Sequence, residues 1–155
     1  MDLYLEYESY KTKLHIAQKN YDKILCRKEE LFRMTQPSPP DMEGERVTGG
    51  EPGNSFDTYL ILKEKENIDE RLEEAKSILD GRRLLLETKL EELKTSNNPY
   101  DKIYYYRFIE KWKVKRISKK ISYGEAQVYR MQKIIREKIN EQRRITAINI
   151  INDGK

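Results

Sequence analysis

A heptad repeat over the first 31 residues is the feature that most constrains the fold. Apolar or aromatic residues recur at alternating spacings of four and three, beginning at Leu3. In an α-helix this spacing keeps one stripe facing a partner helix, here over roughly 45 Å at ~1.5 Å per residue. Because three tyrosines and one lysine belong to the stripe, we expect a packed helical hairpin and not a tight leucine zipper. Its members are Leu3, Tyr7, Tyr10, Leu14, Ala17, Tyr21, Ile24, Lys28 and Leu31.

A second long helix is expected from about Ser55 or Phe56 to Lys94. Gly81 is a weak point in its middle, at a cost of about 1 kcal/mol relative to alanine. Pro37, Pro39 and Pro40 end the first helix, and 36–55 reads as an exposed linker long enough for the second helix to fold back. The same stripes can also pair between two chains, so residues 1–95 are expected to form either an antiparallel hairpin or a homodimer. The second stripe is Leu60 (or Ile61), Lys65, Ile68, Leu72, Ala75, Leu79, Arg82, Leu86, Leu90 and Leu93.

The composition favours slender helices over a thick globule. Apolar residues make up 37% of the chain, and charged residues also make up 37%. These proportions suit an all-α protein with narrow apolar seams. No apolar run approaches the ~20 residues needed to span a bilayer, so no membrane insertion is expected. The single cysteine, Cys26, excludes an intramolecular disulfide and fits a reducing cytosol.

The charge is divided sharply along the chain. Residues 1–98 hold 16 Lys and Arg against 21 Asp and Glu, a net charge of −5, and residues 99–155 hold 15 against 6, a net charge of +9. An acidic front and a basic back suggest one module for protein contacts and another for a polyanion. Nucleic acid is the first candidate, and an anionic membrane surface is the second.

Residues 95–99, Thr-Ser-Asn-Asn-Pro, separate the two parts. Such residues suit a helix end followed by an N-cap and a proline at the first helical position. After them the spacing predicts three helices, about 99–110, 114–120 and 124–140 or beyond, which together form a helix-turn-helix domain over 99–144, followed by a tail over 145–155. The expected core residues are Ile103, Tyr106 (or Tyr105), Phe108, Ile109, Val114, Ile117, Ile121, Val128, Met131, Ile135 and Ile139.

The outer face of the third of these helices has the side chains of a recognition helix. Arg130 suits a guanine's O6 and N7, Gln127 an adenine's N6 and N7, and Glu125 either a cytosine amine or the helix N-terminus. Trp112 reads either as a cap on the core or as a contact to the DNA backbone. The candidates for reading bases are Glu125, Gln127, Tyr129, Arg130 and Lys133. The candidates for holding phosphates are Lys113, Lys115, Arg116, Lys119, Lys120 and Arg136.

A family resemblance appears in the same segment. Residues 104–139 are similar to region 4 of bacterial sigma factors, and closer still to the phage-encoded RinA/ArpU-like late-gene transcriptional regulators. The run Tyr104 to Ile109 resembles an aromatic "YYRYI" helix, Ile117 and Ile121 the short helix after it, and Tyr123 with Val128 to Arg130 a "YS…VYR" recognition helix. Gly124 departs from the serine that usually caps such a helix, so capping falls to Gly124 or Ser122.

The resemblance implies promoter binding in a phage or prophage of a Gram-positive host. The partners expected are double-stranded DNA and RNA polymerase, with an activating role in the cytoplasm of the bacterial cell, at the nucleoid. No metal, cofactor or catalytic site is expected, since the only histidine is His15 and no phosphate-cradling glycine motif exists. Two alternatives stay open: a small terminase-like DNA-packaging subunit, and a helical adaptor that does not bind DNA.

Overall fold

All the residues that the structure describes lie in helices or in the short connections between them. The computed structural model describes residues 2–35 and 55–153, and no strand occurs in these two ranges. The expected all-α fold is therefore confirmed. The predicted linker at 36–55 lies, except for Ser55, outside the described residues.

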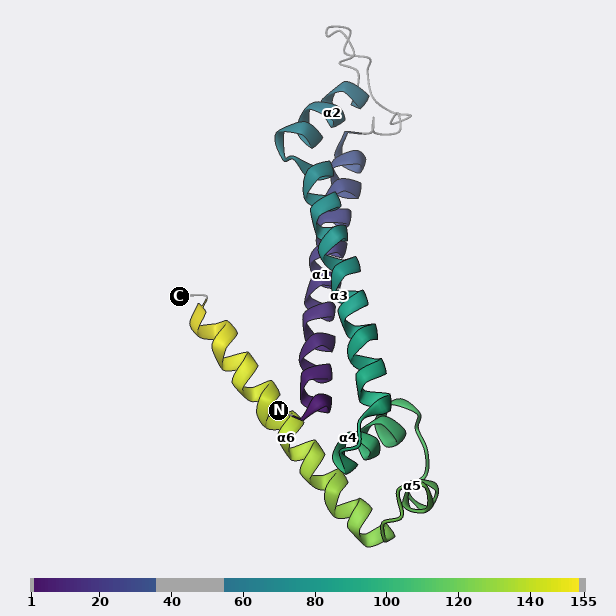
Figure 1. Ribbon diagram of the computed structural model, residues 1–155. Coiled ribbons are helices and arrows are strands. Elements are labelled where there is room, and N and C mark those ends of the chain that lie inside the picture. The colour runs from purple at the N-terminus through teal and green to yellow at the C-terminus, as the bar shows by residue number, and fades with distance from the viewer. Residues whose placement is uncertain (1, 36–54, 154–155) are drawn as a thin grey trace, which may run out of the picture. The chain divides into compact units, whose positions relative to one another are not determined.

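The two long helices of the front part run side by side in opposite directions (Figure 1). They are α1 (Leu3–Met34) and α3 (Ile68–Thr95). Each contributes to both of the compact units into which the chain divides. Unit 1 comprises Met1–Leu14 and Arg82–Lys155, and unit 2 comprises His15–Gly81.

Unit 2 is a helical hairpin with a small apolar core. Leu31, near the end of α1, packs with Ile68, at the start of α3, so the two helices are antiparallel. The heptad positions Ala17 and Ile24 are buried as predicted, as are Ala75 and Leu79 of the second stripe. Lys28 of α1 also forms an ion pair with Asp69 of α3 at 2.9 Å. The predicted pairing of the two stripes is confirmed in this unit.

The prediction of one continuous second helix is wrong, because the chain leaves the helix at Glu66 and Asn67. The break leaves α2 (Ser55–Lys65) ahead of α3, and Asn67 has a left-handed φ of 49°. Asparagine adopts this conformation more readily than most residues, and its N–H bonds to the Glu64 carbonyl at 3.0 Å. The turn changes the phase of α2, so Tyr59 is buried while the predicted Leu60 and Ile61 are exposed.

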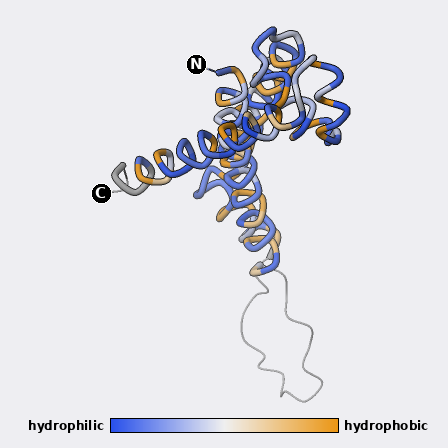
Figure 2. The backbone as a smooth tube through the Cα atoms, turned by 90° about the horizontal axis from the view of Figure 1, so that it is seen from below, coloured by the Kyte–Doolittle hydropathy of each residue, from blue (hydrophilic) through white to orange (hydrophobic). Residues whose placement is uncertain are grey.

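Unit 1 gathers the four remaining elements around the ends of α1 and α3. They are α4 (Pro99–Tyr104), a π-helical turn η1 (Tyr105–Ile109), α5 (Val114–Ile121) and α6 (Glu125–Asp153). Hydrophobic positions recur among hydrophilic ones along these helices (Figure 2). Seven predicted core residues are buried: Ile103, Val114, Ile117, Val128, Met131, Ile135 and Ile139. Tyr105, Tyr106, Phe108, Ile109 and Ile121 are only partly buried against them.

The junction before α4 is built as the sequence predicts. Asn98 is the N-cap, and its side chain accepts a hydrogen bond from the Tyr100 N–H at 3.0 Å, while Pro99 takes the first helical position. The predicted helix 99–110 differs in its second half, where the chain widens into η1 and Glu110 N–H bonds back to the Tyr105 carbonyl. In this wide turn five consecutive side chains are half-buried.

The C-terminal part differs from the prediction in two ways: its last helix is longer, and its core includes residues from α1 and α3. The predicted tail at 145–155 is helical as far as Asp153. Tyr4 of α1 and Leu93 of α3 are buried in the same core as Ile103. The contacts thus join residues 2–14 and 82–98 to the C-terminal helices, and the independence of 99–144 as a domain stays a prediction.

Candidate nucleic-acid interface

A three-residue turn joins α5 to α6 and sets the angle between them. Ser122 ends α5 in the left-handed conformation, at φ 58° and ψ 37°. The Ser118 hydroxyl donates to the Tyr123 carbonyl, and the Tyr123 N–H donates to the Ser118 carbonyl at 3.2 Å. The Gly124 carbonyl accepts from the Val128 N–H at 3.0 Å, so Gly124 occupies the N-cap position and α6 begins at Glu125. The start of the helix, which the sequence left between Gly124 and Ser122, is thereby fixed.

The two faces of the first turns of α6 differ in burial. Val128, Met131 and Ile135 are buried and hold the helix on the core. The five base-reading candidates all lie on the other side and are exposed, with Tyr129 keeping 58% of its surface accessible. They are Glu125, Gln127, Tyr129, Arg130 and Lys133. The structure therefore presents a row of polar and aromatic side chains on a helix whose other side is fixed.

The phosphate candidates form an exposed basic group on the neighbouring segment. Lys113 precedes α5, and Lys115, Arg116, Lys119 and Lys120 lie on it, all exposed, while Val114 and Ile117 face the core. Arg136 lies further along α6, where its guanidinium is 5.8 Å from the centre of the Phe108 ring. Five of the six predicted phosphate residues thus lie on one short segment, and Arg136 lies apart from them in sequence.

Two other cations of α6 are already neutralised inside unit 1. Lys138 forms an ion pair with Asp2 at 2.9 Å, and Arg143 forms one with Glu8 at 2.9 Å. Asp2 directly precedes α1, and Glu8 lies near the start of that helix. The Leu5 carbonyl of α1 also accepts a hydrogen bond from Gln142 of α6. Asp2 and Glu8 therefore neutralise two cations in the second half of the charged part of α6, whereas Arg130 and Arg136 have no such carboxylate partner among the described residues.

The carboxylate of Glu8 is buried within unit 1. It accepts hydrogen bonds from the Tyr104 hydroxyl and from Arg143. Burial acts to raise the pKa of Glu8, but these two hydrogen bonds and the charges of Lys11 and Arg143 together outweigh it, and the pKa lies below its usual range. Burial raises the pKa of the Tyr104 hydroxyl well above its usual range, and the bond to Glu8 adds to that shift. Glu8 is thus charged and Tyr104 neutral at neutral pH, which fastens α1 to α4 and α6.

Trp112 has a role that the sequence left undecided. It is half-buried in the connection between η1 and α5, its ring stacks on Tyr106, and the Arg116 guanidinium lies 3.7 Å from its ring centre. The sequence reading missed this grouping, although a tryptophan four residues before an arginine in a lysine-rich run was a usable signal. Lys111, which is exposed in the same connection, was also not among the predicted phosphate-binding residues.

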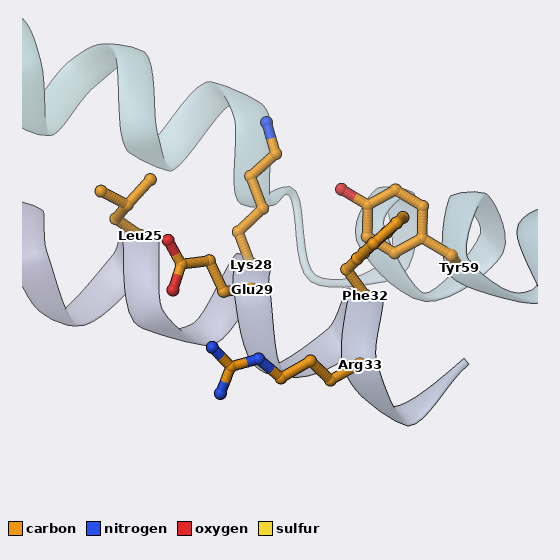
Figure 3. A pocket seen from close by; sticks show the side chains of 6 residues that line it. All are labelled: Leu25, Lys28, Glu29, Phe32, Arg33 and Tyr59. Atoms are coloured by element: carbon orange, nitrogen blue, oxygen red, sulfur yellow. The ribbon is translucent and has the colours of Figure 1, made fainter. Parts of the chain in front are cut away.

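Outside this interface, a shallow pocket lies among the described residues of unit 2 (Figure 3). It has a volume of about 330 Å³ and is lined by Leu25, Lys28, Glu29, Phe32, Arg33 and Tyr59. Its described lining holds no histidine, no cysteine and no pair of carboxylates. Within 2–35 and 55–153 no cluster of His, Cys, Asp or Glu side chains is arranged to hold a metal ion. In the same ranges no helix is long and apolar enough to cross a membrane.

Comparisons of the chain with protein-family models, with curated proteins and with solved structures give no match.

Proposed function

We propose that this chain is a sequence-specific DNA-binding transcriptional regulator that binds duplex DNA through α5 and α6. The observation that carries the proposal is the exposed row Glu125, Gln127, Tyr129, Arg130 and Lys133 at the start of α6. A short turn separates it from the lysine-rich α5, as in helix-turn-helix proteins, whose second helix enters the major groove. The chain acts by binding and not by catalysis.

The two helices offer different kinds of contact to DNA. Arg130 and Gln127 match the hydrogen-bonding edges of guanine and adenine, and the exposed Tyr129 ring suits an apolar contact such as a thymine methyl group. Lys113, Lys115, Arg116, Lys119 and Lys120 supply contacts to phosphates, which give affinity without reading sequence. The net charge of +9 over residues 99–155 supports this assignment, since duplex DNA is a strong polyanion.

The regulatory part of the proposal rests on the sequence resemblance to RinA/ArpU-like regulators and to sigma factor region 4. It comprises activation of phage or prophage genes, contact with RNA polymerase, and a location at the nucleoid of the bacterial host. The front helices serve dimerisation or contact with a partner. Their acidic net charge supports protein contacts over DNA contacts.

Selection of bound fragments from the source genome tests the proposal directly. The purified full chain is mixed with sheared genomic duplex at moderate salt, and the retained fragments are sequenced. We expect enrichment at a few loci that share a short motif upstream of genes. Uniform recovery of all fragments, or no recovery, contradicts sequence-specific binding.

Two measurements separate the alternatives. A small terminase subunit forms a ring of many copies, whereas we expect light scattering to give the mass of a monomer or dimer. A helical adaptor for an acidic protein or membrane surface retains no duplex at moderate salt, so recovery of any DNA excludes it.

A further inference from the structure

Arg116 differs from the lysines around it because its side chain is held in place. Its Cζ lies 3.7 Å from the centre of the Trp112 ring, within the range of a close cation–π contact. Trp112 is itself stacked on Tyr106, with 4.5 Å between ring centres and 20° between ring planes. Lys115, Lys119 and Lys120 are exposed and have no such support within the described part of the chain.

The indole that supports Arg116 is fixed through its backbone. The Trp112 N–H donates to the Tyr106 carbonyl at 2.8 Å, and Arg107 Nη1 donates to the Trp112 carbonyl at 2.9 Å. Both bonds tie the connection before α5 back to η1. Because Tyr106 and Arg107 belong to a turn packed on the core, the position of the indole is set by unit 1.

The stacked guanidinium keeps its hydrogen-bonding edges available. A guanidinium is planar, so stacking uses its face and leaves its N–H groups directed outward in the plane. Within residues 2–35 and 55–153, no carboxylate lies within ion-pair distance of Arg116, in contrast to Lys138 and Arg143. An anion with two oxygens side by side, such as a phosphodiester, matches these free edges.

We propose that Trp112 is a positioning residue that holds the Arg116 guanidinium for contact with a phosphate of duplex DNA, an inference that rests on the proposed function. Arg116 lies on the helix that precedes the reading helix, and in helix-turn-helix proteins this helix crosses the DNA backbone. The partner group is therefore a phosphate and not a base. Holding the side chain beforehand removes the entropy cost of ordering it on binding.

The first test uses a fluorescently labelled mixed-sequence duplex at low salt, because a phosphate contact does not depend on sequence. Binding of the full chain is followed by anisotropy. Arg116→Ala is expected to weaken binding about tenfold, and Arg116→Lys to show most of that loss, since an ammonium cannot both stack and bridge two oxygens. Arg71→Lys, at an exposed position of α3 in unit 2, is the matched control and stays within about twofold of the parent.

A double-mutant cycle tests whether Trp112 acts through Arg116. Trp112→Leu alone is expected to weaken binding about threefold to tenfold, and Trp112→Leu combined with Arg116→Ala to bind like Arg116→Ala alone. Thermal unfolding shows whether Trp112→Leu is folded. If Trp112→Leu is unfolded, the fluorescence emission of Trp112, the only tryptophan, tests the coupling without replacing it. Saturating duplex is expected to change this emission in the parent and to change it much less in Arg116→Ala.

The outcomes separate this inference from the proposed function. If the parent binds duplex and Arg116→Lys binds equally well, the Trp112–Arg116 inference is overturned and DNA binding stands. Additive losses in the cycle, or an equal emission change with and without Arg116, also overturn the positioning role. A parent that binds no duplex at low salt overturns both.

Discussion

The buried carboxylate of Glu8 accepts a hydrogen bond from the hydroxyl of Tyr104, a residue 96 positions further along the chain. The same carboxylate binds Arg143 of α6 at 2.9 Å. One acidic side chain of α1 thus joins two of the C-terminal helices at the edge of the shared core, in which Tyr4 and Leu93 are also buried.

Tyr104→Phe removes the hydroxyl from this link and is expected to destabilise the protein by about 1–3 kcal/mol, because a buried charge loses a hydrogen bond. Urea denaturation at neutral pH measures the change. Tyr105→Phe is the control, since its hydroxyl bonds to Glu110 at the surface, and it should cost less than about 0.5 kcal/mol. Equal effects of the two substitutions would show that the Glu8 link adds no stability.

The lowered pKa of Glu8 predicts a loss of stability in acid. A carboxyl whose pKa is depressed on folding stabilises the protein above its unfolded pKa, here near the ordinary glutamate value of 4.5, and this contribution is lost as the pH falls through the folded pKa. Melting temperatures followed downward from neutral pH should therefore fall less steeply in Glu8→Gln than in the parent below that value. Asp2, whose pKa Lys138 also lowers, leaves some slope in the variant. Glu141→Gln, at an exposed position, is the control and should show the same dependence of melting temperature on pH as the parent. If Glu8→Gln also shows the parent's dependence, Glu8 is not the group that links stability to pH.

Gly81→Ala is expected to stabilise the protein by up to about 1 kcal/mol. Gly81 lies within α3, where alanine is the better helix former, and an added Cβ meets no atom within 4 Å. Chemical denaturation measures the gain. A loss of stability would mean that this position bears a strain or contact that the helix does not show.

Ser122→Gly is expected to raise the free energy of unfolding by about 1 kcal/mol, because glycine adopts the left-handed conformation at the end of α5 without the steric cost that serine has. Because Ser122 is not a proposed DNA contact, binding to DNA should not change. Ser122→Val is the opposite variant, since a β-branched residue is strained at this φ, and it should unfold at a lower temperature. Thermal unfolding and duplex binding of both variants check the two statements together.

Arg130→Ala is expected to cost about 1–3 kcal/mol on the selected DNA site and to relax the preference at one base pair. Replacing Lys119 and Lys120 by alanine should weaken binding to every sequence and lower the salt slope by about one for each lysine removed. Titrations of selected and mixed duplex at several salt concentrations distinguish the two patterns. If both variants bind like the parent, the assigned faces are wrong.

The sequence predicted most where local signals and burial agree. Asn98 and Pro99 mark the start of α4 because capping is a local interaction, and the spacing of Val128, Met131 and Ile135 identified the inner face of α6. Asn67 was missed because a single left-handed asparagine breaks a helix without disturbing the apolar spacing around it. The π-helical turn after Tyr104 was also missed, since no residue pattern specifies it locally.

The contacts of Tyr4 and Glu8 with the C-terminal helices lay beyond prediction for a different reason. The heptad assigned the neighbouring positions Leu3 and Tyr7 to the stripe that faces the partner helix, whereas Tyr4 and Glu8 are the buried residues. Their partners are Asp101, which accepts from the Tyr4 N–H, and Tyr104 and Arg143, all far away in sequence. In the candidate interface, likewise, exposure of the predicted residues followed from periodicity, while the stacking of Trp112 between separate elements did not.

The two segments of unit 1 enclose the whole of unit 2 in the sequence, and this has a consequence for the order of folding. The bond from the Tyr4 N–H to Asp101 spans 97 residues, and contacts between such distant residues slow folding because a long loop must close first. Forming the hairpin of residues 15–81 beforehand shortens the loop that remains to be closed. We therefore expect substitutions at Leu31 and Ile68, which are buried in unit 2, to slow the closing of unit 1 as well as to weaken the hairpin.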